Sequence, residues 1–176
     1  MISSWIRGAA ICALLGGIIA AAQNESPATK TCPSPLTATD STYAPGQVWS
    51  YKARDGESES TITILRVESL PKIGIIVHVR IDGIRLRNCS GGGSPTTIQH
   101  APFTKESIDK SVLRLESKKV ELPDFEEGYS NWKANCGGVY TITIAEMLQA
   151  GELTLNGGKS CSQSQQPDPN GLGSEN

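Results

Sequence analysis

The alternating apolar residues of Ile73–Ile81 constrain the fold of this chain more than any other feature. Every second residue is Ile or Val, a pattern typical of a β-strand that buries one face. Asp82-Gly83 follows immediately, and this dipeptide is typical of a two-residue type I′ turn. Because residues 84–87 resume the alternation, the sequence predicts a β-hairpin over residues 73–87.

The predicted register of this hairpin places basic residues opposite one another. A two-residue loop pairs Arg80 with Arg85 and His78 with Arg87 on the outward face. Like charges directly across a strand pair are destabilising by about 0.2–1 kcal/mol, so an acidic counterpart is expected. Two interpretations are open. The four residues bind a protein partner or a small anionic ligand. Alternatively, acids of adjoining strands neutralise them in a solvated surface; the candidates are Asp55, Glu57, Glu59 and Glu68.

Two further strands are predicted before the hairpin. Residues 47–52 are rich in aromatic and β-branched side chains, which favour a strand. Residues 60–68 alternate as well, but the alternation slips by one residue near Leu65, which predicts a β-bulge there. A short late strand is predicted over residues 138–142.

The remaining periodic segments predict three helices, beginning near Thr104, Asp124 and Thr143. The first is expected to reach Leu115, and the third opens with a capping box formed with Glu146. The second carries an aromatic stripe expected to be buried, formed by Phe125, Tyr129 and Trp132. Strands followed by helices predict an α+β fold, with an antiparallel sheet of about four to five strands and two or three helices packed on one face.

The first residues predict export. Arg7 precedes a short apolar run, and small residues end it, as in a cleaved secretory signal peptide over residues 1–22. We expect a flexible arm over residues 23–42, one α+β domain over 43–156 and a flexible tail over 157–176, because both ends are poor in residues to bury. The predicted location is periplasmic or extracellular, with no transmembrane anchor after processing.

Four cysteines remain after processing: Cys32, Cys89, Cys136 and Cys161. An even number in an oxidising compartment predicts two disulfides, for which three pairings are possible. Pairing of Cys89 with Cys136 and of Cys32 with Cys161 is favoured, because the first two flank structured segments and the other two lie in terminal ones. Metal ligation is not expected, because no close Cys or His spacing exists.

Charge and motifs disfavour several function classes. Of 16 basic and 18 acidic side chains, removal of Arg7 leaves 15 basic ones and a net charge of −3, so nucleic-acid binding is not expected. The chain has no Gly-x-Ser-x-Gly, His-Glu-x-x-His, P-loop or dinucleotide-binding motif. We therefore assign no catalytic residue and expect no cofactor.

His78 and His100 are the only histidines, and they leave one enzyme hypothesis open. If they met an acid such as Glu106 or Asp124, they could form a general base or a metal site. The favoured interpretation is that His78 is an exposed strand residue and His100 a loop residue, because nothing local in the sequence brings them together.

Several short motifs resemble those of a group of short bacterial proteins that has no established activity. The motifs are Pro45-Gly46-Gln47-x-Trp49-x-Tyr51, Arg54, Gly56-Glu57, His100-x-Pro102-Phe103, Gly128-Tyr129-x-x-Trp132 and Gly138-Val139-Tyr140-Thr141-Ile142. The resemblance covers about residues 43–150 and implies a bacterial, periplasmic setting. It transfers no catalytic residue to this chain.

The sequence predicts, first, a small exported binding module that recognises a protein partner, for example as an inhibitor or immunity-type protein. The first alternative is a hydrolase with a non-local site made of histidine and carboxylate. The second is a structural envelope component tethered through its terminal segments.

Overall fold

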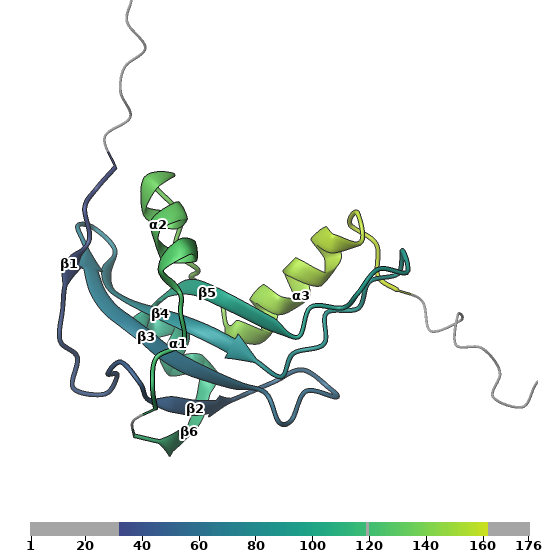
Figure 1. Ribbon diagram of the computed structural model, residues 1–176, viewed down its shortest axis with the longest axis horizontal. Coiled ribbons are helices and arrows are strands. Elements are labelled where there is room, and N and C mark those ends of the chain that lie inside the picture. The colour runs from purple at the N-terminus through teal and green to yellow at the C-terminus, as the bar shows by residue number, and fades with distance from the viewer. Residues whose placement is uncertain (1–31, 119, 162–176) are drawn as a thin grey trace, which may run out of the picture. The chain divides into compact units, whose positions relative to one another are not determined.

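A six-stranded antiparallel sheet forms the centre of the fold, with the strand order β5-β4-β3-β2-β6 and β1 paired with β3 (Figure 1). The computed structural model describes residues 32–118 and 120–161. The predicted signal peptide and most of the predicted tail lie outside these residues. The described strands and helices are β1 (Leu36–Thr37), β2 (Val48–Tyr51), β3 (Thr61–Leu70), β4 (Gly74–Asp82), β5 (Thr97–Thr104), β6 (Val112–Ser117), α1 (Lys105–Ser111), α2 (Glu126–Ala134) and α3 (Ile144–Leu155). This arrangement confirms the α+β fold.

The predicted β-bulge in β3 is confirmed. The pairing of β3 with β4 shifts between Ile64 and Arg66, so Leu65 is the extra residue. Ile64 and Val67 remain in the main core, whereas Leu65 packs with the aromatic residues of α2. The bulge therefore supplies the sheet with a second apolar contact on its opposite face.

The two faces of the sheet are covered by different helices. On one face, Val77 and Val79 of β4 belong to the main core together with Ile108 of α1 and Leu148 of α3. His78 lies between these valines and points to the other face, because side chains alternate along a strand. Two helices thus cover one face as predicted, while α2 packs on the face that we expected to meet solvent.

The predicted hairpin over residues 73–87 is wrong after its first strand. Gly83 has the positive φ of 77° that a turn requires, but residues 84–87 do not pair with β4. Instead β4 pairs with β5, and the backbone N–H groups of Ile84 and Leu86 donate to Thr96 and Pro95. The side chains of Ile84 and Leu86 still enter the core, so burial alone explains their alternation.

The helices begin close to where the sequence predicts. Thr104 caps α1 by accepting a hydrogen bond from the N–H of Ser107, and Thr143 and Glu146 form the predicted capping box of α3. In contrast, α1 ends at Ser111 and the chain continues as β6, which replaces the predicted helical extension to Leu115. The predicted strand over residues 138–142 is reduced to a single bridge between Phe103 and Tyr140.

The disulfides join Cys32 to Cys136 and Cys89 to Cys161, so the favoured pairing is wrong. Cys136 follows the end of α2, where the segment from Cys32 passes. Near the end of α3, the N–H of Cys89 donates to Asn156, which places Cys89 beside the residues that lead to Cys161. Their sequence separations of 104 and 72 residues correspond to about 4–5 kcal/mol of chain entropy for either bridge alone.

The folded part extends beyond the predicted domain at both ends. β1 and Cys32 lie in the predicted N-terminal arm, and Cys161 lies in the predicted tail. Tyr43, the first predicted domain residue, is buried in the core. The disulfides thus fix the segments that a composition-based boundary assigns to flexible ends.

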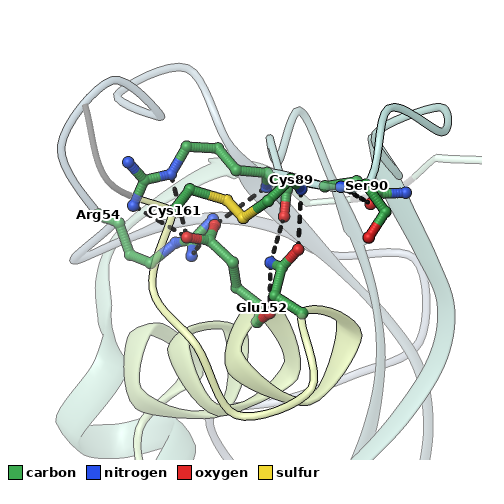
Figure 2. Close-up of a disulfide and its surroundings, with 8 residues drawn as sticks. Arg54, Cys89, Ser90, Glu152 and Cys161 are labelled. Atoms are coloured by element: carbon green, nitrogen blue, oxygen red, sulfur yellow. Dashed lines mark hydrogen bonds and ion pairs between the residues drawn. A yellow bond between two sulfur atoms is a disulfide. The ribbon is translucent and has the colours of Figure 1, made fainter. Parts of the chain in front are cut away.

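A charge cluster built on two buried carboxylates lies beside the Cys89–Cys161 disulfide (Figure 2). The carboxylate of Glu152, on α3, accepts hydrogen bonds from the Arg54 guanidinium and from both the N–H and the side chain of Arg87. Arg54 also pairs with Glu57, whose carboxylate accepts from the N–H of Arg85. We call these residues, Arg54, Glu57, Arg87 and Glu152, the α3 cluster.

Candidate functional site

The register of β4 and β5 brings the two histidines of the chain together. His78 lies opposite Pro102, and the pairing shifts between Val79 and Ile81, so that His100 of β5 approaches His78. The distance between His78 Nδ1 and His100 Nε2 is 2.9 Å. The favoured interpretation of two separate histidines is therefore wrong.

Glu68 of β3 completes a buried chain of polar side chains. Its Oε2 lies 3.2 Å from His78 Nε2, and its Oε1 accepts a hydrogen bond of 2.9 Å from the hydroxyl of Tyr129. Arg66 Nη1 lies 3.6 Å from the same Oε1. We call Glu68, His78 and His100 the polar chain. The acid is neither Glu106 nor Asp124, the two that the sequence suggested.

Burial dominates the electrostatics of the polar chain. Glu68 is 2% exposed and His78 is fully buried, whereas His100 is half-buried. Burial, reinforced by the nearby His100 and Arg66, lowers the pKa of His78 to about 3, and burial also lowers the pKa of His100. Both imidazoles are therefore neutral at pH 7. Burial and the Glu68 carboxylate raise the pKa of Tyr129, which keeps its hydroxyl as a donor.

Helix α2 closes over the polar chain through aromatic contacts and one glycine. The rings of Tyr129 and Trp132 meet His78 edge-on, with centroids 5.5 and 4.9 Å away. A Cβ atom added at Gly128 would lie 3.0 Å from the Cβ of His100. The glycine that weakens this helix in isolation therefore permits its close approach to β5.

His100 opens into a pocket of about 590 Å³ between β5, α2 and residues 138–140. Its lining consists of Gln99, His100, Pro102, Gly128, Asn131, Trp132, Gly138, Val139 and Tyr140. A second hollow of about 450 Å³ shares Gln99 and Gly128 with it and extends to Arg80 and Asp124. The two hollows adjoin, and we refer to them together as the β5–α2 groove.

The four residues of the predicted cationic surface do not lie together. His78 is buried in the polar chain, and Arg80 bonds to Asp82 and Gln99 at the edge of the groove. Arg85 and Arg87 follow the turn, with the side chain of Arg87 held by Glu152 in the α3 cluster. The cross-strand pairs of like charge that motivated this site are therefore not formed.

The polar chain can pass a proton or a hydrogen bond between Glu68 and the groove, because its members face one another in series. The groove lining offers amide, imidazole and aromatic groups and, in its second hollow, the charged groups of Arg80, Asp124 and Glu127, but no Ser, Thr or Cys side chain as a nucleophile. In the part of the chain described, no group of three or more His, Cys, Asp or Glu side chains could hold a metal ion.

Sequence reasoning missed β5 and the role of Glu68. The sequence predicts His100 as a loop residue, but residues 97–104 form β5 although Pro102 lowers their strand propensity. The bulge near Leu65 was the available signal for Glu68. It shifts the alternation of β3, so that Arg66 and Glu68 point toward the face that carries His78.

No protein-family model, curated protein or solved structure matches this chain.

Proposed function

We propose that this chain is an exported binding module whose β5–α2 groove holds an extended segment of a partner protein. The observation that carries the proposal is the groove itself, about 590 and 450 Å³ in its two adjoining parts. Aromatic side chains with a few convergent polar groups are typical of the linings of binding sites.

The outer edge of β5 favours an extended segment as the occupant. At its C-terminal half this edge already accepts another chain segment: the N–H of Thr104 donates to Tyr140, and the N–H of Tyr140 donates to Pro102. Residues 97–100 continue the same edge into the groove. An exposed strand edge pairs readily with an added strand, and side-chain pockets beside it supply specificity.

Export is supported by the covalent structure. Two disulfides join segments far apart in sequence, and such bridges persist in oxidising compartments. No helix within residues 32–118 and 120–161 has the length and apolar character to cross a bilayer. A periplasmic or extracellular location, reached through a cleaved signal peptide, agrees with both findings.

Site-specific photocrosslinking tests this proposal. A photoreactive residue replaces Gln99 or Asn131, both exposed in the groove, and Leu113 on β6 serves as the control because it is exposed at the opposite edge of the sheet. We expect crosslinks from the two groove positions to one contiguous segment of a single protein in an extract of the source cells. Equal crosslinking from position 113, or none from the groove, would contradict the proposal.

A second candidate function is a hydrolase, favoured by the 2.9 Å contact between the histidines and the carboxylate behind them. His100 would act as the general base on a water molecule, since the groove lining offers no Ser, Thr or Cys side chain. This candidate ranks second because burial lowers the pKa of His100 and so weakens it as a base. Chromogenic ester, amide, glycoside and phosphoester substrates test it: hydrolysis must occur with the full chain and disappear in His100→Gln.

A further inference from the structure

The buried end of the polar chain determines where its protons lie. Glu68 Oε1 accepts a hydrogen bond from the hydroxyl of Tyr129 and lies 3.6 Å from the Arg66 guanidinium, which can only donate. Oε1 therefore faces two donors. Oε2, the oxygen that faces His78, is therefore an acceptor.

The position of the His78 proton follows from that acceptor. His78 Nε2 and Glu68 Oε2 are 3.2 Å apart, and neither of these buried atoms has a hydrogen-bond partner in the described structure. A lone pair on Nε2 would place two acceptors in contact away from water, which is costly. The single proton of the neutral imidazole therefore lies on Nε2, and Nδ1 of His78 carries the lone pair.

His100 must then donate to His78. Its Nε2 lies 2.9 Å from the unprotonated Nδ1 of His78, so Nε2 carries the proton of the neutral His100 ring. The remaining nitrogen, Nδ1, bonds to none of the described residues and is not among the buried atoms left without a partner. It is thus open to a ligand at the wall of the groove.

We propose that His100 Nδ1 is a hydrogen-bond acceptor and that Glu68 and His78 fix its orientation. The partner protein is recognised there by a group that donates a hydrogen bond, either an amide N–H or a hydroxyl. A carboxylate offers only acceptors at neutral pH and is disfavoured at this point. This inference rests on the proposed binding function and names the chemistry of its central contact. It replaces the anionic ligand expected from the arginines.

The charged and titratable groups that face the polar chain are few. Glu68 and Arg66 belong to β3, the two histidines to β4 and β5, and Tyr129 to α2. Arg66 pairs with Glu68 and also with the exposed Glu126 of α2, and Tyr129 remains protonated. The arrangement of protons described here is therefore the neutral-pH state.

Long-range ¹H–¹⁵N correlation spectra of the full-length, ¹⁵N-labelled protein at pH 7 test the inference without a ligand. We expect both histidines to be the Nε2–H tautomer, each with an unprotonated Nδ1. A Nδ1–H tautomer or a charged ring at His100 would overturn the proposal. In Glu68→Gln the amide can present a donor to His78, and we expect the fixed pattern to be lost at both rings, whereas Glu121→Gln, an exposed change outside the groove lining, leaves it intact.

A chemical probe gives a second readout. Diethyl pyrocarbonate acylates accessible, unprotonated imidazole nitrogens, so it should modify His100 at pH 7 and leave the fully buried His78 unmodified in the folded protein. Equal modification of both residues, or of neither, would overturn the proposal. These outcomes are independent of the crosslinking result: a failed search for a partner refutes the binding function, and a wrong tautomer refutes only this inference.

Discussion

Glu152 and Glu68 are both buried carboxylates, 3% and 2% exposed, but they belong to different faces of the sheet and have different partners. In the α3 cluster, Glu152 accepts from two arginine side chains and a backbone N–H. In the polar chain, one oxygen of Glu68 accepts from Tyr129, and the other has no directed hydrogen bond. All the donors to Glu152 come from the α3 cluster itself. The second oxygen of Glu68 instead faces His78, which in turn contacts His100 at the groove.

The comparison separates stability from function. A buried carboxylate whose donors all come from the chain itself fixes the packing around it, here α3 and the loop that carries Cys89 (Figure 2). A buried carboxylate that orients an imidazole at a pocket wall fixes a binding group instead. Substitutions should therefore affect unfolding most in the α3 cluster and ligand recognition most in the polar chain.

The largest expected effect is the loss of stability in Glu152→Ala. Removing this carboxylate leaves Arg54 Nη1 and the N–H of Arg87 without their acceptor, although Arg54 keeps Glu57; unsatisfied donors of this kind lower the free energy of unfolding by about 3–5 kcal/mol together. Urea unfolding of the oxidised protein measures it. Glu68→Gln should cost only about 1 kcal/mol, because its amide oxygen still accepts from Tyr129. Equal losses in both variants would contradict the comparison, and the exposed Glu121→Ala serves as the control.

The second effect is a dependence of stability on pH that arises from His78. Its folded pKa of about 3 lies below the unfolded value of 6.5, so the unfolded state binds more protons between these values. The contribution of His78 is complete above pH 6.5 and is lost as the pH falls, by about 3 kcal/mol between pH 7 and pH 4. Urea unfolding across this range measures the loss.

The control for this pH effect is His78→Gln, which should be less stable at pH 7 but lose less stability on acidification. The α3 cluster responds in a different window. Burial would raise the pKa of Glu152, but the hydrogen bonds from Arg87 and Arg54 outweigh it and lower this pKa below 4.5. Its contribution is lost only below pH 4.5, so a wild-type protein equally stable at pH 7 and pH 5 would exclude the His78 effect.

The third effect separates two arginines that the sequence predicts to lie together. Arg80 lines the groove and Arg85 does not. Arg80→Glu should reduce crosslinking from position 99 to the partner segment about tenfold, as is common for a contact worth about 1.4 kcal/mol. Arg85→Glu should leave it unchanged. If the two variants behave alike, the groove is not the site.

Local sequence signals predicted the elements that depend only on near neighbours. The bulge at Leu65, the cap at Thr104 and the capping box at Thr143 all follow from residues within a few positions of one another, and all are confirmed. The aromatic stripe of α2 was likewise expected to be buried, and both Phe125 and Tyr129 are buried.

Long-range pairing was not predictable from the same signals. The turn at Gly83 forms, yet the strand after it is replaced by β5, because the core can bury Ile84 and Leu86 without pairing them to β4. That exchange of partners changes the site. It moves Arg85 away from Arg80 and brings His100 to His78, and no local pattern encodes a contact across 22 residues with a register shift.

The smallest effect compares two helix glycines. Gly151 in α3 has open space where a Cβ would lie, so Gly151→Ala should raise the free energy of unfolding by about 0.5–1 kcal/mol through helix propensity. Gly128→Ala gains the same propensity but brings its Cβ to 3.0 Å from the Cβ of His100. We expect a net loss of about 1 kcal/mol and a change in the ¹⁵N resonances of His100. If Gly128→Ala stabilises the protein as Gly151→Ala does, α2 does not press on β5, and the polar chain lacks the support that fixes its orientation.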